Sequence, residues 1–115
     1  MKRIVTINEL KARYYLKDTF LYATRCLNIN LKQKGRFYVA SCPFHQDTTP
    51  SFYLYSKNSK NRFKCFSAKC ERGSWDIFAL IQDLEGCSFI EAVKQFGQYV
   101  NVDEVIIPRG KRIVI

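Results

Sequence analysis

The chain has 115 residues and carries 19 Lys and Arg against 10 Asp and Glu, a formal net charge of +9. This length predicts one small domain and excludes a multi-domain enzyme, and a hydrophobic content of 47% excludes a disordered tail. Such a basic excess is typical of proteins that bind nucleic acid or an anionic membrane. The sequence has no long apolar run and no apolar signal core, so we expect a cytosolic or nucleoid-associated protein and no membrane partner.

The first predicted unit is an N-terminal helical segment over residues 1–30. Thr6 and Glu9 have the spacing of a capping box at the start of a helix. The apolar positions that follow predict a helix from about residue 8 to 25, broken near Asp18. The next residues, up to Lys34, are polar and basic and predict no clear element.

The second predicted unit, over residues 31–73, is a small ribbon of antiparallel strands. Alternating side chains predict a strand over residues 36–40 and another over 51–55. A polar, turn-rich loop then leads into a return strand over residues 62–64. We expect an antiparallel sheet of about 3–5 short strands, packed with N-terminal and C-terminal helices, which makes the fold class α+β.

The third predicted unit, over residues 74–100, consists of helices. Ser74 is predicted to cap a helix that ends at Gly86, and Ser88 to cap a second helix that runs to about Tyr99. The remaining residues, 101–115, have no clear partner and are predicted to be a tail or linker.

The cysteines and the single histidine suggest a metal site. The chain has 5 cysteines and no export signal, which favours a reducing compartment where clustered thiols bind metal. A Cys-x-x-His pair and a Cys-x4-Cys pair, joined by a predicted hairpin, have the form of a zinc ribbon. Four N and S ligands fill a tetrahedral shell, so we expect one structural Zn²⁺. The predicted ligands are Cys42, His45, Cys65 and Cys70.

The alternative is a set of unrelated core cysteines with a surface histidine. The only histidine stands at ligand spacing from a cysteine, which favours the metal site. The looser second pair makes Cys70 the least secure ligand. Cys26 and Cys87 lie outside both pairs, and we expect them to be small buried hydrophobic residues.

Residues 35–52, GRFYVASCPFHQDTTPSF, resemble the Cys-Pro-Phe-His…Thr-Pro-Ser-Phe signature of the N-terminal zinc-binding domain of bacterial DNA primases. Residues 65–66 resemble the start of the second metal knuckle of that family. Residues 76–78 and 84–93 resemble its Asp-x-Ile-x-Phe and Glu-Gly-x-Ser-Phe-x-Glu-Ala-Val segments. The resemblance extends over about residues 27–97 and implies a zinc ribbon from the bacterial cytoplasm.

Two departures from the family are visible. The second knuckle of the family is a tight Cys-x-x-Cys, whereas this chain inserts residues there and carries Lys69, Glu71, Arg72 and Trp75. Primases of this type also have a catalytic Toprim domain with a glutamate and an Asp-x-Asp pair, and this chain lacks such a cluster. It therefore resembles the zinc module alone, either as part of a longer primase or as a free-standing relative from a plasmid, phage or mobile element.

The charge is concentrated in the first two thirds of the chain. Residues 1–72 carry +11, residues 73–104 carry −5 and residues 105–115 carry +3. Cations and aromatic side chains alternate on the predicted strands, a pattern that suits phosphates and stacked bases of single-stranded DNA. The predicted DNA-binding residues are Lys34, Arg36, Tyr53, Tyr55, Lys60, Arg62 and Lys64.

The sequence also suggests the environment of two further groups of side chains. Arg62 and Lys64 are expected on one face of their strand, with Phe63 packed inside. For Trp75 beside the second knuckle, base stacking and core packing both remain open.

The sequence therefore predicts a zinc-binding, single-stranded DNA template-binding domain of a primase, supporting RNA primer synthesis in DNA replication. The chain shows no catalytic centre of its own. The resemblance implies a catalytic Toprim domain as partner, making the whole a DNA-directed RNA polymerase, with the replicative helicase as a further partner. The alternatives are a stand-alone DNA-binding accessory or regulatory protein, and a module whose acidic segment, residues 73–104, binds a helicase or polymerase.

Overall fold

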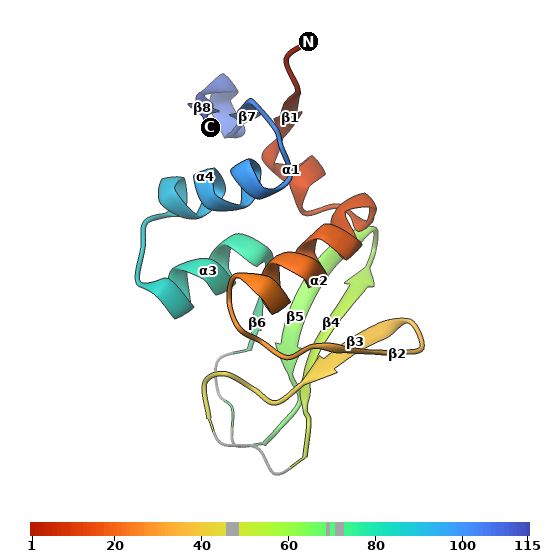
Figure 1. The fold of residues 1–115 in the computed structure, drawn as a ribbon. Helices are drawn as coiled ribbons and strands as arrows, with labels where there is room; N and C mark the ends of the chain where they lie inside the picture. The colour runs from red at the N-terminus through yellow and green to blue at the C-terminus, as the bar shows by residue number, and fades with distance from the viewer. Residues whose placement is uncertain (46–48, 69, 71–72) are drawn as a thin grey trace.

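The fold combines two sheets with helices, and it is seen in a computed structural model that describes residues 1–45, 49–68, 70 and 73–115. The described residues form a five-stranded sheet, a three-stranded sheet and four α-helices (Figure 1). The α+β prediction is therefore confirmed. None of the helices in these ranges is long and apolar enough to cross a bilayer.

The larger sheet is antiparallel throughout and has the strand order β2-β3-β4-β5-β6. The three strands predicted from alternation are confirmed as its centre, and β2 and β6 were not predicted. All three residues of β2 are exposed, so this strand has no alternating apolar pattern. The strands are β2 (Lys32–Lys34), β3 (Phe37–Ala40), β4 (Phe52–Lys57), β5 (Lys60–Cys65) and β6 (Ser74–Trp75).

The two faces of this sheet differ in burial because successive side chains point to opposite sides. On the inner face, Phe52, Leu54 and Phe63 are completely buried. On the outer face, Arg62 and Lys64 are partly exposed, flanking Phe63 as predicted. The sheet therefore has one side for the core and one side for solvent.

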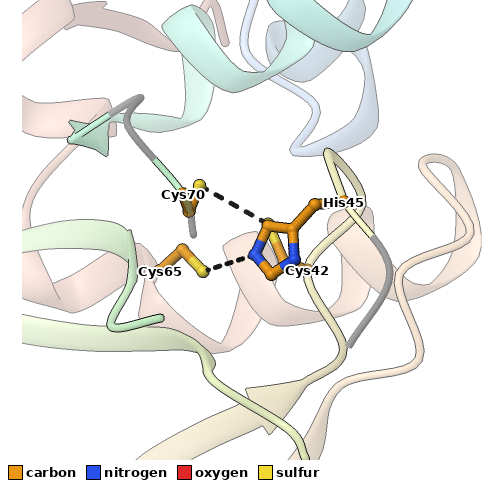
Figure 2. Close-up of side chains that lie close together, drawn as sticks. All are labelled: Cys42, His45, Cys65 and Cys70. Atoms are coloured by element: carbon orange, nitrogen blue, oxygen red, sulfur yellow. Dashed lines mark hydrogen bonds between the residues drawn. The ribbon is translucent and has the colours of Figure 1, made fainter. Parts of the chain in front are cut away.

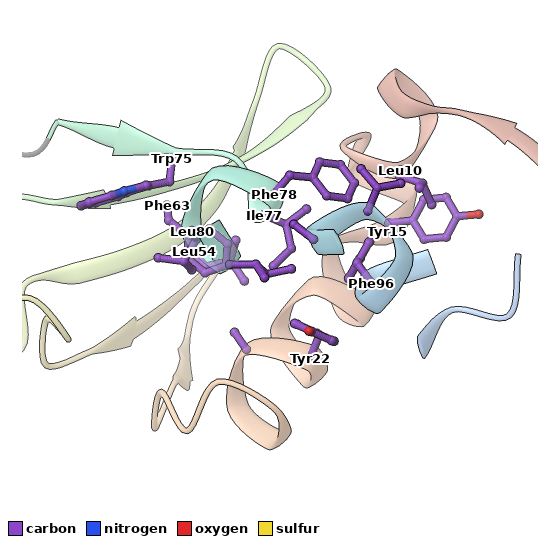
Figure 3. Close-up of a cluster of buried hydrophobic side chains, with 14 of the residues drawn as sticks. Leu10, Tyr15, Tyr22, Leu54, Phe63, Trp75, Ile77, Phe78, Leu80 and Phe96 are labelled. Atoms are coloured by element: carbon purple, nitrogen blue, oxygen red, sulfur yellow. The ribbon is translucent and has the colours of Figure 1, made fainter. Parts of the chain in front are cut away.

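Helices cover the inner face. Figure 1 shows α2 (Leu16–Arg25) and α3 (Ile77–Glu85) beside the sheet, with α4 (Phe89–Tyr99) next to α3. The ring of Phe20 on α2 stacks on Tyr38 of β3, with 4.2 Å between centroids. The side chains of the two layers form one buried cluster, which includes Leu54, Phe63, Phe78, Leu80 and Phe96 (Figure 3).

The N-terminal helix is divided at a different point from the one predicted. Thr6 does cap α1 (Ile7–Leu10), since its hydroxyl accepts a hydrogen bond from the Glu9 N–H. The backbone then becomes extended at Ala12, and a 3-10 turn over Arg13–Tyr15 leads into α2. The predicted break near Asp18 is therefore wrong.

Docking of the β4–β5 hairpin explains the position of this break. The N–H of Arg13 donates to the carbonyl of Ser59 at 2.8 Å, and the Asn61 side-chain amide donates to the carbonyl of Ala12 at 2.7 Å. A continuous helix would need these backbone groups of Ala12 and Arg13 for its own hydrogen bonds. The hairpin residues that bond to them lie far away in the sequence.

The caps of the later helices were partly predicted. Ser74 does not cap α3, because it pairs with Lys64 in the sheet, and Asp76 accepts the capping bond from the Ala79 N–H at 2.8 Å instead. Gly86 ends α3 with a φ of +64°, as a C-terminal glycine does. Ser88 caps α4 as expected.

The C-terminal residues are not an unpartnered tail. They form β7 (Glu104–Ile106) and β8 (Arg112–Val114), joined through a 3-10 turn over Pro108–Gly110. β7 pairs in parallel with β1 (Ile4–Thr6), so the two ends of the chain meet in the smaller sheet. Three-residue strands are too short to show a period, which is why the sequence did not reveal them.

Candidate metal centre and nucleic-acid interface

The four predicted metal ligands come together at one end of the larger sheet. Cys42 and His45 follow β3, Cys65 is the last residue of β5, and Cys70 lies in the connection to β6. Their ligand atoms all lie within 4.8 Å of one another. The Sγ atoms of Cys42 and Cys70 are 3.9 Å apart, and His45 Nε2 lies 3.2 Å from Cys65 Sγ (Figure 2).

Strand pairing and a turn place these residues. Cys65 pairs with Phe52 at the end of the β4–β5 hairpin, and the next N–H, that of Phe66, donates to the carbonyl of Ser51. The N–H of Cys70 donates to the carbonyl of Ser67 at 3.1 Å, which turns the chain back toward Cys65. The longer gap between the two cysteines therefore still brings Cys70 to the cluster.

The thiols of the cluster have different proton affinities. Burial raises the pKa of Cys42 to about 12. Burial also raises the pKa of Cys65, but hydrogen bonds from His45, Ser51 and the backbone of Ser67 outweigh it and bring this pKa to about 7. Ionising all three thiols at one point requires a compensating cation.

The chemistry of the donor atoms indicates which cation fits the cluster. Three thiols and one imidazole, within reach of a single ion, match the closed tetrahedral site of a structural zinc. The cluster fits one structural Zn²⁺, as predicted. Lys69 and Arg72 of the expanded knuckle lie outside the described residues, as does Glu71.

Aromatic rings pack beside the metal centre and resolve the alternatives for Trp75. Its ring is 3% exposed and stacks on Phe44, with 4.9 Å between centroids and 14° between planes. Its indole N–H donates to Asp83 at 2.7 Å. Trp75 therefore packs in the core and is not an exposed platform for bases.

The two remaining cysteines differ from the prediction. Cys26 is exposed and Cys87 is partly exposed, so the expectation of small buried residues is wrong for Cys26. It is the C-cap residue of α2 and lies beyond the buried positions of that helix, which are Thr19, Tyr22 and Ala23.

The predicted DNA-binding residues lie on or beside one surface, the outer face of the larger sheet. Tyr53 pairs with Lys64, and Tyr55 with Arg62, so these four side chains form two adjacent rows. The register of the neighbouring strands places the others. Lys34 and Lys60 belong to the same face, and Arg36 lies exposed in the turn between β2 and β3.

An open hollow of about 490 Å³ lies on this face, here called the aromatic hollow. Phe37 and Phe66 are 46% and 58% exposed, which is unusual for phenylalanine. Neither ring belongs to the DNA-binding set predicted from the sequence, and Lys57 does not belong to it either. Their position beside the paired tyrosines could not be read from one strand alone. The hollow is lined by Phe37, Tyr53, Tyr55, Lys57, Lys64 and Phe66.

Two pairs of rings in the hollow stand at steep angles to each other. Phe37 and Phe66 make angles of 73° and 89° with the ring of Tyr53, at centroid distances of 6.1 and 5.3 Å. Lys64 Nζ lies 5.0 Å from the centroid of the Phe66 ring. Aromatic rings and an ammonium group thus lie together in the hollow.

The charge around the hollow has one sign. Residues 27–68 include seven Lys and Arg and a single acid, Asp47, which lies outside the described residues. Arg62 is held on the outer face by a 2.6 Å hydrogen bond to Ser74 Oγ. This surface is therefore complementary to a polyanion with planar groups.

Comparison with known proteins gives consistent results. The family model described as "CHC2 zinc finger", of the DnaG zinc-ribbon type, matches residues 5–109. A DNA primase of Staphylococcus aureus (strain COL) is 38% identical over 96 residues, which cover 84% of this chain and 14% of that protein. A DNA primase of Staphylococcus epidermidis is 36% identical over 74 residues, which cover 64% of this chain and 12% of that protein.

A solved structure is also similar. The crystal structure of the Aquifex aeolicus primase, comprising its zinc-binding and RNA polymerase domains, matches with a TM-score of 0.58 and 32% identity. The match covers 80% of this chain and 20% of that one. The chain thus spans only a small part of the length of the primases that it matches.

Proposed function

The chain belongs to the CHC2 zinc-finger family of DnaG-type primases, and from this premise we propose that it is the single-stranded DNA template-binding module of a DNA primase. The observation that carries the proposal is the outer face of the larger sheet. Cations and exposed aromatic rings occupy this face around the aromatic hollow. The module supports RNA primer synthesis by holding the template.

Different side chains of this face contact different parts of the DNA. The ammonium and guanidinium groups of Lys34, Lys60, Arg62 and Lys64 neutralise phosphates, which makes binding dependent on salt. The rings of the aromatic hollow stack against bases, each worth about 1–3 kcal/mol. A duplex hides its base faces, so this surface favours single strands.

The zinc centre stabilises the conformation of the binding surface. We assign Cys42, His45, Cys65 and Cys70 as the four ligands, and the bound ion supplies cross-links between the loop after β3 and the end of β5. Cys65 is adjacent to both Lys64 and Phe66 in the chain, so ordering this ligand also orders two residues of the aromatic hollow. The ion's role here is structural.

The wider context is part of the same proposal. A catalytic Toprim region makes the primer as a DNA-directed RNA polymerase, and the zinc module presents the template to it in the bacterial cytoplasm. The replicative helicase is a further partner. A free-standing accessory or regulatory protein would bind DNA through the same face without a catalytic partner.

Titration of labelled single-stranded oligonucleotides with the zinc-loaded chain tests the proposal. Binding that neutralises four phosphates weakens about 50-fold between 50 and 200 mM salt, given the usual slope for single strands. No binding at low salt, or an affinity that is unchanged by salt, would contradict DNA binding and favour a protein-interaction module built on the acidic helices.

A further inference from the structure

A second hollow borders the larger sheet and has a different lining. It has a volume of about 370 Å³, is bordered by Pro43 and Pro50, and is here called the polar hollow. Three of its lining residues, Asn28, Asn30 and Ser41, have amide or hydroxyl side chains, and all three residues are exposed. None of them belongs to the surface predicted from the sequence.

The two hollows are neighbours. Val39 lines the polar hollow, and its cross-strand partner Tyr53 lines the aromatic hollow. Adjacent β-strands lie about 4.8 Å apart. A DNA strand that is bound in one hollow therefore reaches the other. Lys32 pairs with Val39 on the same face and also lines the polar hollow, which extends the positive charge to it.

The segment that carries the two asparagines is held by buried neighbours. Ile29 and Leu31 are 3% and 4% exposed, and the Ile29 N–H donates to the carbonyl of Ala23 at 3.1 Å. Alternation around these anchors leaves Asn28 and Asn30 in solvent. Their amides are therefore presented from a fixed backbone.

The linings predict different ligand groups. Aromatic rings stack on any base, because every base has a π-face. Amides and hydroxyls instead pair with the donors and acceptors along base edges, where sequence is encoded, and single-stranded bases leave these edges free. Residues 27–45 contain no acidic side chain, so nothing negative in this segment opposes a DNA strand at the polar hollow.

We propose that Asn28, Asn30 and Ser41 form a subsite that reads the edge of one template base, while the adjacent aromatic hollow stacks a neighbouring base of any identity. This inference rests on the proposed function, because it needs a single strand bound to the outer face. The polar hollow then determines the base preference, and the aromatic hollow contributes affinity that does not depend on sequence.

The test compares binding of the zinc-loaded chain to single-stranded oligonucleotides that differ at one position at a time. The variant Asn28→Gly with Asn30→Ala and Ser41→Ala removes the three polar groups. Glycine suits position 28 because its φ is +57°, where alanine would be strained. Asn30→Ala alone is a milder second variant, and Asn8→Ala, an exposed asparagine on α1, is the matched control.

We expect the unmodified chain to prefer one base at one position by about fivefold or more, the lower range for a paired amide contact. The triple variant should reduce this preference to less than about twofold while keeping its affinity for a homopolymer, its zinc content and its melting temperature. Asn30→Ala should reduce it in part, and Asn8→Ala should leave it unchanged.

Three results would overturn the inference, and they are distinguishable from failure of the proposed function. The first is an unmodified chain that binds every sequence equally. The second is a folded triple variant that keeps the full preference, and the third is a loss of homopolymer affinity equal to the loss of preference. In each case salt-dependent binding leaves the proposed function standing, whereas absence of all binding at low salt would overturn that function as well.

Discussion

The inner and outer faces of the larger sheet are built by the same strands and have opposite characters. Phe52, Leu54 and Phe63 of the inner face are completely buried, whereas Tyr53 and Lys64, one residue away, border an open hollow. Residues that stabilise the fold and residues proposed to bind DNA are therefore neighbours along the same strand. Substitutions on one face should change folding and those on the other should change binding.

The largest effect is expected at the metal centre, which lies at the end of β5. Cys65→Ser removes one proposed zinc ligand, and structural zinc in small domains contributes on the order of 10–16 kcal/mol of apparent binding free energy. We expect zinc content to fall well below one equivalent by metal analysis, with loss of cooperative unfolding of the ribbon. Cys26→Ser, at an exposed cysteine outside the cluster, should keep the zinc, and full zinc content in Cys65→Ser would refute the ligand assignment.

The next effect concerns the centre of the inner face. Phe63→Ala leaves a cavity among fully buried rings, including Phe52 at 5.7 Å, and should lower the free energy of unfolding by about 3–5 kcal/mol. Lys64→Ala, the adjacent residue on the outer face, serves as the comparison and should change it by less than about 1 kcal/mol. Equal losses in denaturant unfolding would break the distinction between the faces.

A smaller effect, on binding alone, is expected at the aromatic hollow. Phe66→Ala removes an exposed ring and should weaken single-stranded DNA binding by about 1–3 kcal/mol per stacked base. Its melting temperature should remain close to that of the unmodified chain. Tyr14→Ala is the control, since this ring is 82% exposed but lies outside the hollow; an equal loss of affinity there would count against stacking on the sheet.

The smallest effect is expected at an ion pair that lies outside both faces of the larger sheet. Lys2 forms an exposed ion pair with Glu104 of the smaller sheet, at 3.4 Å. Such pairs are worth about 0–1 kcal/mol, so Lys2→Ala should barely change the free energy of unfolding. Its DNA affinity at moderate salt should also be close to that of the unmodified chain, and a large loss would show that binding follows net charge and not the outer face.

Local patterns in the sequence predicted the features that depend on local chemistry. The ligand spacing, the three central strands, the caps at Thr6 and Ser88 and the burial of Phe63 all follow from neighbouring residues. Alternation also placed Arg62 and Lys64 on the same side of their strand.

Features that depend on distant partners could not be predicted. The break at Ala12 requires the hairpin that docks on it, and β7 and β8 require β1 from the other end of the chain. Ser74 has the chemistry of a cap, but pairing with Lys64 takes it into the sheet. The two hollows likewise exist only once strands lie side by side, so their lining could not be deduced from any single segment.

A matched pair of double variants tests whether the outer face of the larger sheet binds single-stranded DNA. Arg62→Ala with Lys64→Ala removes two cations from that face, and Lys94→Ala with Lys111→Ala removes two exposed cations from α4 and the residue before β8. The measurement is oligonucleotide affinity of the zinc-loaded proteins across a salt series.

We expect the outer-face variant to lose affinity at low salt and its salt dependence to become shallower by about 1.4 in log–log slope, or about 0.7 for each phosphate contact. The control pair should keep the slope of the unmodified chain. Identical slopes and affinities for the two double variants would contradict the claim, because binding would then depend on total charge and not on this face.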